Sequence, residues 1–109
     1  MVEVIKSFIR SLNLFIVLWL LSVKPSHGYG IIKEFRKLTG LEINPGTIYP
    51  LLHMLEKEEF VISKWVIEKN KTRRYYFLTL KGKDLFKKFQ SLFKKHLKVF
   101  IEFLIVEPQ

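Results

Sequence analysis

Residues 43–57 read INPGTIYPLLHMLEK and carry the signals of a helix start. Asn44 can act as the N-cap by accepting a hydrogen bond from a backbone N–H of the first helical turn. Pro45 then occupies the first helical position, where no N–H donor is needed. Ile43 and Ile48 have the spacing of a hydrophobic staple, which fixes the entry of the chain into the helix. We therefore predict a helix that begins at Pro45.

The predicted helix has one apolar face and one face that is small near its start. At about 100° per residue, its large aliphatic residues gather on one side, namely Ile48, Leu51, Leu52 and Leu55. The opposite side carries Gly46, Pro50, His53 and Lys57, flanked by Thr47, Tyr49 and Met54. This side holds no carboxylate before Glu56. Its first turns can therefore approach a large acidic surface, and the major groove of DNA fits that description.

The chain has 109 residues, which suggests a single domain. A domain this small would be helped by a second chain in burying a full core. Its net charge of +9 is unevenly placed, because residues 61–98 hold twelve Lys and Arg against two Asp and Glu. Such a field favours a polyanionic partner, either nucleic acid or an acidic membrane surface. The chain has no cysteine, which excludes disulfide and thiolate chemistry and suits an intracellular protein.

The segment from Glu3 to Val23 is predicted to be a mostly buried helix, because its first apolar residues have helical spacing. Its continuous apolar run, residues 14–21, is shorter than the roughly 20 residues that span a bilayer. A signal peptide is the competing interpretation, but residues 24–26 (Lys-Pro-Ser) form a poor cleavage site. We therefore expect an intracellular protein in which Pro25 ends this helix and Ser26 caps the next.

A second helix is predicted from Gly28 to Leu38, with an inner stripe that ends at Leu38 and a stop at Gly40. The early glycines, Gly28 and Gly30, suggest close approach to a neighbouring helix or to a phosphate. Tyr29 has two interpretations, a hydrogen bond to a phosphate or packing against the first helix. The short connection to Asn44 gives this pair of helices the dimensions of a helix-turn-helix.

Two runs rich in β-branched and aromatic residues follow, over 60–68 and 72–79. Between them lies a polar turn, residues 69–71, in which Asn70 can take a positive φ. The pattern predicts a β-hairpin whose basic tip comprises Lys69, Lys71, Arg73 and Arg74. Because two strands alone are marginally stable, the hairpin must lean on the helices. Three helices followed by a basic hairpin predict a winged helix-turn-helix.

The last segment, Lys81 to Val106, is predicted to be a long amphipathic helix with a lysine-rich face opposite phenylalanines and aliphatic residues. Its apolar stripe is larger than a small domain can cover, so we expect it to pack on the first helix and on a second copy. The expected dimer interface comprises Phe8, Leu12, Phe15, Trp19, Phe86, Phe89, Phe93, Phe100 and Phe103. A helix of this pattern is also typical of proteins that lie on a membrane surface.

Three blocks of sequence, in order, resemble the PadR-like transcriptional regulators. They are residues 27–31 (HGYGI), 46–56 (GTIYPLLHMLE) and 73–82 (RRYYFLTLKG). The resemblance implies a winged-helix DNA-binding domain, a C-terminal dimerisation helix, and a role as a repressor that a small molecule releases in some members. Two positions depart from the family pattern. Met54 replaces a usual basic residue, and Glu59 replaces the glycine that usually closes the turn into the wing. The short final helix leaves the position of any effector site open.

Catalysis has little support in the sequence. None of the three histidines, His27, His53 and His96, lies at metal-ligand spacing from another histidine or a useful carboxylate. The acidic residues at 56, 58 and 59 are most simply a solvated helix end. We expect no catalytic site, no metal and no cofactor.

Together these patterns predict a mainly α protein with a small β-hairpin, in which residues 1–80 form the winged-helix portion and residues 81–106 the dimerisation helix. We expect a cytoplasmic homodimer that binds a palindromic operator in double-stranded DNA and acts as a repressor. The alternative is a basic amphipathic protein that works at membrane surfaces or as an interaction adaptor. The expected DNA contacts are Tyr29, Asn44, Gly46, Thr47, Tyr49, Pro50, His53, Lys69, Lys71, Arg73 and Arg74. The operator, the regulated gene and the effector do not follow from the sequence.

Overall fold

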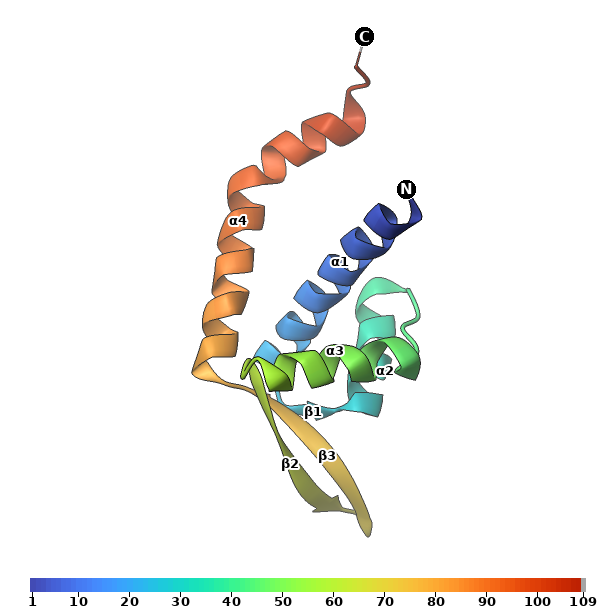
Figure 1. Cartoon of the computed structure of the whole chain (residues 1–109), viewed down its shortest axis with the longest axis vertical. Helices are drawn as coiled ribbons and strands as arrows, with labels where there is room; N and C mark the ends of the chain where they lie inside the picture. The colour runs from blue at the N-terminus through green and yellow to red at the C-terminus, as the bar shows by residue number, and fades with distance from the viewer. Residues whose placement is uncertain (109) are drawn as a thin grey trace.

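The structure is a computed structural model that describes residues 1–108, in which four helices lie at the base of a small three-stranded antiparallel sheet and the hairpin of the sheet projects away from them (Figure 1). The elements are α1 (Val2–Val23), β1 (Ser26–His27), α2 (Gly28–Thr39), α3 (Pro45–Lys57), β2 (Val61–Glu68), β3 (Lys71–Leu78) and α4 (Leu80–Ile105). This arrangement confirms the predicted winged helix-turn-helix with a long C-terminal helix.

Helix α3 begins as its sequence predicts. The Asn44 side chain accepts a hydrogen bond of 3.0 Å from the backbone N–H of Thr47, and Pro45 is the first helical residue. Ile43 and Ile48 on either side of this cap are both buried in the core. The capped start therefore fixes which face of α3 turns inward and leaves the face around Gly46 and Pro50 exposed.

The core lies where α1, α2 and α3 meet the base of the hairpin. Its fully buried residues are Val17, Leu18, Ile31, Ile48, Leu52, Leu55 and Val61. Phe35 joins them from α2, as predicted, but Leu38 is exposed and the prediction that it belongs to the inner stripe is wrong. The reason is that α2 extends past the edge of α3 before Gly40 ends it, so no element covers its last turn.

The hairpin β2–β3 is the wing, and its two strands pair in antiparallel register from Val61–Leu78 to Glu68–Lys71. The turn has two residues, Lys69 and Asn70, both with positive φ, so the predicted turn of three residues was one too long. A positive φ at both positions is the geometry of the tight turn that matches the twist of a hairpin. Asn70 takes this conformation as predicted.

The third strand was not predicted. Residues Ser26 and His27 form β1, which pairs with Tyr76 and Tyr75 of β3. The prediction that Ser26 caps α2 is also corrected, because the cap is His27, whose Nδ1 accepts a hydrogen bond of 3.0 Å from the N–H of Gly30. Only two residues pair, which is too short a run to show a period-two pattern in the sequence.

The turn from α3 into the wing takes a left-handed conformation at Glu59, with φ of 63°. Two groups bind the carbonyl oxygens of this turn. The Thr79 hydroxyl donates to the Glu59 carbonyl at 2.6 Å, and the Lys81 ammonium donates to the Glu58 carbonyl at 2.8 Å. Glu59 stands where the family that the sequence resembles usually has glycine, and contacts from the start of α4 therefore hold it in a glycine-like conformation.

Helix α4 starts tightly against this turn. Thr79 caps it by accepting from the Gly82 N–H at 3.0 Å, and a Cβ on Gly82 would lie 2.1 Å from the Phe60 carbonyl oxygen. Only glycine fits this contact between helix and turn without a shift of backbone. From there α4 leaves the core, and the outer halves of α1 and α4 both extend away from the wing (Figure 1).

Helix α1 has 22 residues, so the eight-residue apolar run underestimates its apolar length. By length and composition α1 could cross a membrane, with a mean hydropathy of 1.8 over its most apolar window, of which 17% is buried inside the chain. The expectation that this segment is too short to span a bilayer is therefore corrected. Its inner half nevertheless supplies Val17, Leu18 and Leu21 to the core, as a core helix of a globular protein does.

Candidate nucleic-acid interface

The exposed face of α3 presents five of the residues that the sequence predicted for DNA contact. Gly46, Thr47, Tyr49, Pro50 and His53 are all exposed. Pro50 has no N–H to donate, so the Gly46 carbonyl lacks its helical partner and can accept a hydrogen bond from outside. The first two turns of α3 thus form a small, carboxylate-free surface with an available backbone acceptor.

The start of α2 is fitted against this face. A Cβ on Gly28 would lie 2.5 Å from the Tyr49 hydroxyl oxygen, so the tyrosine ring rests directly on the Gly28 backbone. Close approach to a neighbouring helix is therefore the use of this glycine. Tyr49 still exposes 45% of its surface. Tyr29 is exposed as well, which rules out the alternative that it packs against α1.

His27 joins the start of α2 to the wing. Its Nδ1 accepts a hydrogen bond from the Gly30 N–H. The Arg73 Nη1 lies 3.1 Å from the His27 Nε2, and the ring of Tyr75 meets the imidazole edge-on. Burial lowers the pKa of His27, and the charge of Arg73 lowers it further. The contact of His27 with the wing was not predicted, although His27 is the first residue of the block HGYGI at residues 27–31.

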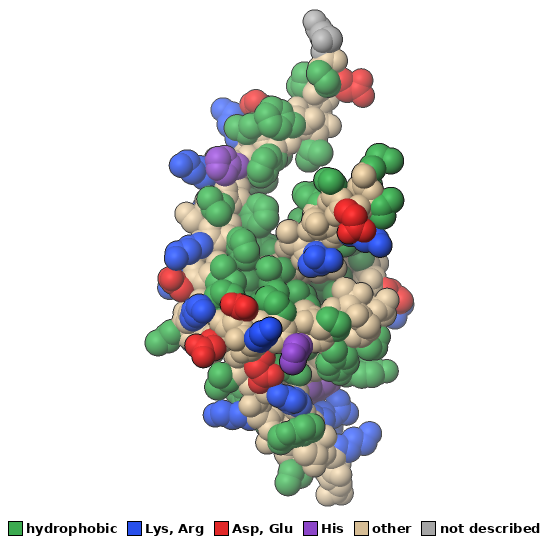
Figure 2. All heavy atoms as spheres, viewed as in Figure 1, with side chains coloured by type: hydrophobic (Ala, Val, Ile, Leu, Met, Phe, Trp, Pro, Cys, Tyr) green, Lys and Arg blue, Asp and Glu red, His purple; other side chains and the backbone are tan. Residues whose placement is uncertain are grey.

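A basic hollow of about 270 Å³ lies between His27 and the tip of the wing, lined also by Glu68, Lys69, Lys71 and Arg73. The carboxylate of Glu68 accepts a hydrogen bond of 2.5 Å from the Tyr75 hydroxyl. Among the described residues, no ion pair joins Glu68 to Arg73 or Arg74. Figure 2 shows Lys and Arg side chains gathered around the hairpin end of the molecule.

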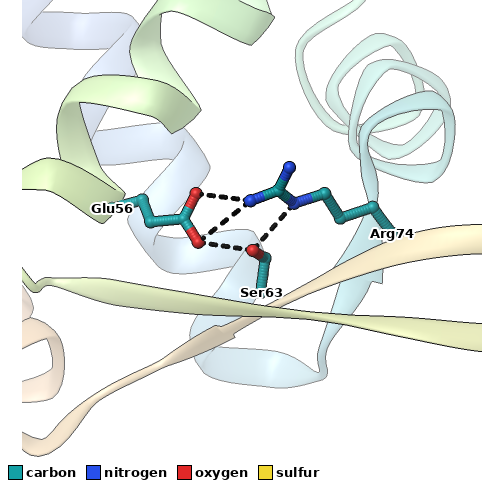
Figure 3. Close-up of polar contacts among 3 residues, drawn as sticks. All are labelled: Glu56, Ser63 and Arg74. Atoms are coloured by element: carbon teal, nitrogen blue, oxygen red, sulfur yellow. Dashed lines mark hydrogen bonds and ion pairs between the residues drawn. The ribbon is translucent and has the colours of Figure 1, made fainter.

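Arg74 points to the helix and not to the tip. Its Nη2 donates to the two carboxylate oxygens of Glu56 at 3.0 and 3.3 Å, and its Nε donates to the Ser63 hydroxyl at 2.8 Å (Figure 3). Ser63 in turn donates to Glu56, and this hydrogen bond lowers the pKa of the carboxyl, with a smaller contribution from the charge of Arg74. The interpretation of Glu56 as part of a solvated helix end is wrong, because tertiary contacts bind it.

A second hollow, of about 540 Å³, separates the outer half of α1 from α3. Its walls include Lys6, Ile9 and Arg10 on α1 and Pro50 and Met54 on α3. The position where Met54 replaces a usual basic residue therefore lies on the flank of α3 that faces α1. Gly46 and Thr47 border the same hollow, so it adjoins the exposed start of α3.

The residues predicted for a dimer interface divide into two groups. Phe86 is buried and stacks on Phe15 at 5.5 Å, and the ring of Phe93 meets Phe15 edge-on at 4.9 Å. Phe89 is half-buried beside them. Phe93 remains 39% exposed despite its contact with Phe15. The other members are exposed, namely Phe8, Leu12, Trp19, Phe100 and Phe103. Figure 2 shows hydrophobic side chains lining the space between α1 and α4.

Within residues 1–108, no group of three or more His, Asp or Glu side chains is placed to hold a metal ion. The site is therefore built from exposed backbone, aromatic and basic groups, which are suited to binding an anionic polymer.

Comparisons with known proteins agree with this arrangement. Residues 17–88 match the model of the transcriptional regulator PadR-like family. Over 57 residues the chain is 33% identical to a transcriptional regulator of Mycobacterium tuberculosis, and this match spans about half of each protein, 52% in both cases.

Solved structures match along most of the chain. A transcriptional regulator from Clostridium thermocellum is 30% identical with a TM-score of 0.78, covering 89% of this chain and 94% of that one. A PadR-like transcription factor from Bacteroides fragilis is 25% identical with a TM-score of 0.80, covering 92% and 97%. A PadR family regulator from Clostridium difficile is 26% identical with a TM-score of 0.78, covering 84% and 97%.

Proposed function

The chain belongs to the PadR-like family of transcriptional regulators, and from this premise we propose that it is a cytoplasmic homodimer that represses transcription by binding a palindromic operator. The observation that carries the proposal is the juxtaposition of two surfaces. The exposed, carboxylate-free start of α3 and the basic wing are joined through the start of α2, where Gly28 contacts Tyr49 of α3 and His27 contacts Arg73 of the wing. The members of this family are regulators and not enzymes.

In this proposal α3 enters the major groove with the face around Tyr49 and His53. Asn44 and Tyr29 lie near the phosphate backbone at either side, and Gly46, Thr47 and Pro50 allow the helix to come close to the base edges. Tyr49 is held in place by Gly28, so its ring is presented in one orientation. A side chain that is ordered before binding loses little entropy on contact with DNA.

The wing contributes phosphate or minor-groove contacts through Lys69, Lys71 and Arg73. Arg74 was expected with them and belongs to the same basic surface, but its guanidinium is already bound by Glu56 and Ser63. Neutralising Lys69 and Lys71 together should weaken binding to every DNA sequence and reduce the salt dependence by about two phosphate contacts. An unchanged salt slope would count against wing contact.

Dimerisation is proposed through the outer halves of α1 and α4. Their exposed apolar side chains together form a larger apolar surface than the single, scattered apolar residues that are normal on a protein surface. Each phenylalanine that a partner fully buries is worth roughly 1.5–3 kcal/mol. Repulsion between the lysines of two α4 helices is screened beyond about 8 Å at physiological salt, so the apolar contacts should outweigh it.

The experiment is selection of bound sequences from a random DNA pool with the intact chain. A recovered palindrome, with half-sites about one helical turn apart, would support both specificity and two-fold symmetry. Substituting Tyr49 and His53 by alanine should then relax the preference while the dimer stays folded. Binding to anionic vesicles with no preferred DNA sequence would instead favour the membrane-surface alternative, to which the apolar α1 also conforms.

Family membership implies a small-molecule effector for some members, and we propose where such a molecule would bind in this chain. The hollow between α1 and α3 adjoins the start of α3, so a molecule bound there would alter the surface offered to DNA. A thermal-shift screen that compares the parent with Met54→Trp, which fills the hollow, tests this location. A ligand that stabilises both proteins equally binds elsewhere.

A further inference from the structure

Among the described residues, the ion pair between Arg74 and Glu56 is the one that joins α3 to the wing. It is also more than a pair. Arg74 on β3, Ser63 on β2 and Glu56 in the last turn of α3 bind one another in a closed ring of hydrogen bonds (Figure 3). We call these three residues the Glu56 cluster. Both strands of the wing are therefore bound by side chains to the last turn of α3 at this place.

The place of the cluster along the hairpin makes this tie important. Closer to the helices, Val61 and Tyr76 are buried and β1 pairs with β3, so that end of the wing is fixed by packing. Further out, residues 67–72 are all exposed. The cluster begins at the edge of the buried zone, where Ser63 pairs with Tyr76, and extends outward to Arg74. It therefore holds the wing from the side of α3, while His27 contacts Arg73 from the start of α2.

The geometry is suited to holding a direction. Arg74 uses two nitrogens of one planar group, Nη2 for Glu56 and Nε for Ser63, which fixes an orientation that a single charge contact does not. The guanidinium carbon also lies 5.8 Å from the Trp65 ring. The group is thus bound at Nε and Nη2 and approached by one ring, although the side chain is 44% exposed.

We propose that Glu56 is a positioning residue for DNA recognition, which acts through Arg74 to hold the wing at a set angle to α3. The inference rests on the proposed function, since it concerns the spacing between major-groove and wing contacts. Correct spacing allows both contacts on one operator, whereas a loose wing can still bind phosphates anywhere. The cluster therefore contributes to the preference for the operator and little to general affinity for DNA.

A substitution at Glu56 separates this role from a simple phosphate contact by Arg74. Glu56→Gln removes a negative charge and frees the guanidinium. If Arg74 serves as a phosphate contact, the variant should bind all DNA more tightly. If Glu56 positions the wing, the ratio of operator affinity to non-specific affinity should fall, roughly five- to tenfold for coupled neighbours.

The matched control is Glu58→Gln, which makes the same charge change two residues along. The Glu58 side chain is exposed and has no hydrogen bond or ion pair within the described residues, although its backbone carbonyl binds Lys81. Glu58→Gln should leave the ratio unchanged within about twofold. Arg74→Lys keeps the positive charge but has no planar group that binds Glu56 and Ser63 through two separate nitrogens, so it should reproduce the loss of preference seen in Glu56→Gln.

The decisive comparison is made both without and with DNA. In the free protein, amide exchange of residues 64–74 should quicken in Glu56→Gln and Arg74→Lys but not in Glu58→Gln, with circular dichroism showing that each variant is folded. Unchanged exchange, or an operator ratio that stays at the parent value in Glu56→Gln, overturns the positioning role. A parent that prefers no sequence overturns the proposed function instead, and the exchange experiment still decides whether Glu56 holds the wing.

Discussion

The inner and outer halves of α1 and α4 differ strongly in how much of their apolar surface is buried. The inner half of α1 buries Val17, Leu18 and Leu21, while its outer half leaves Val4, Ile5 and Phe8 exposed. Helix α4 repeats the contrast, because Phe86 is 7% exposed and Phe103 is 73% exposed. Residue type does not distinguish the halves. What distinguishes them is whether another element of the same chain lies opposite.

The contrast teaches that the chain completes its winged-helix core alone, whereas its outer helices stay uncovered in the single chain, which supports the proposed dimer. A monomer would keep a continuous apolar surface in water, which is uncommon in soluble proteins. The inner half should therefore govern the folding of each chain, and the outer half should govern association. Each of the following changes affects one half and spares the other.

The largest effect is expected from Phe86→Ala in the inner half. The ring stacks on Phe15 and lies in the core, so its removal should cost about 3–5 kcal/mol of the free energy of unfolding. Urea denaturation at several protein concentrations measures this. The loss should appear at every concentration, and a loss that vanishes at high concentration would mean that Phe86 serves association instead.

The matched change in the outer half is Phe103→Ala. Because this ring is exposed in the single chain, its removal should leave the fold intact and weaken dimerisation by roughly 1.5–3 kcal/mol per protomer if a partner buries it. Sedimentation over a range of concentrations measures the dissociation constant. A parent that sediments as a soluble monomer at micromolar concentration would remove the basis for a partner on this surface.

Acid should loosen the inner half first, at the start of α2. The pKa of His27 is lowered in the folded chain from an ordinary value of 6.5, so the unfolded chain takes up the proton more readily. Stability from this group is fully present above pH 6.5 and is lost as pH falls below it. Protonation of Nδ1 removes the cap that Gly30 uses.

Glu56 adds a second and lower acid window. Its pKa is also lowered, from an ordinary value of 4.5, so its contribution is present above that pH and is lost below it. Thermal unfolding as a function of pH should therefore show two declines. His27→Asn, which can still cap a helix, should remove the first decline and keep the second; persistence of the first decline would assign it to another group.

The smallest expected effect is a gain of stability in Glu59→Gly. Glu59 has a left-handed φ of 63°, which glycine adopts without strain. The substitution should raise the stability of the inner half by about 1 kcal/mol, or a few degrees in Tm for a domain of this size. Differential scanning calorimetry measures this, and Glu58→Gly, at a residue with φ of −85°, is the control that should not stabilise.

The sequence predicted local structure correctly where the residues that interact lie within one element or one turn. Asn44 and Pro45 predict the start of α3, and the β-branched and aromatic runs on either side of the turn at Asn70 predict the wing, because caps and tight turns are made by neighbours along the chain. The same reasoning failed at Leu38, at β1 and at the cap by His27. Each of these depends on which distant segment happens to lie opposite.

The candidate site divides in the same way. Exposure of Pro50 and His53 follows from helical periodicity, since they lie opposite the apolar stripe. The binding of Glu56 by Arg74 does not, because a carboxylate near the end of one helix can pair with any of the nineteen Lys and Arg of the chain. No spacing along the chain encodes a distance between residues that only the packed hairpin brings together.

The amino-acid sequence by itself determined the order of the four helices and the hairpin, the apolar face of α3 and the basic character of the wing. Periodicity, capping and charge are local properties, and they act before the chain is compact. Only the tertiary structure decided that Tyr49 rests on Gly28, that His27 meets Arg73 and that Glu56 holds the wing. The physical reason is that hydrogen bonds and close contacts are effective over only a few ångströms, so they depend on the packed fold for their partners.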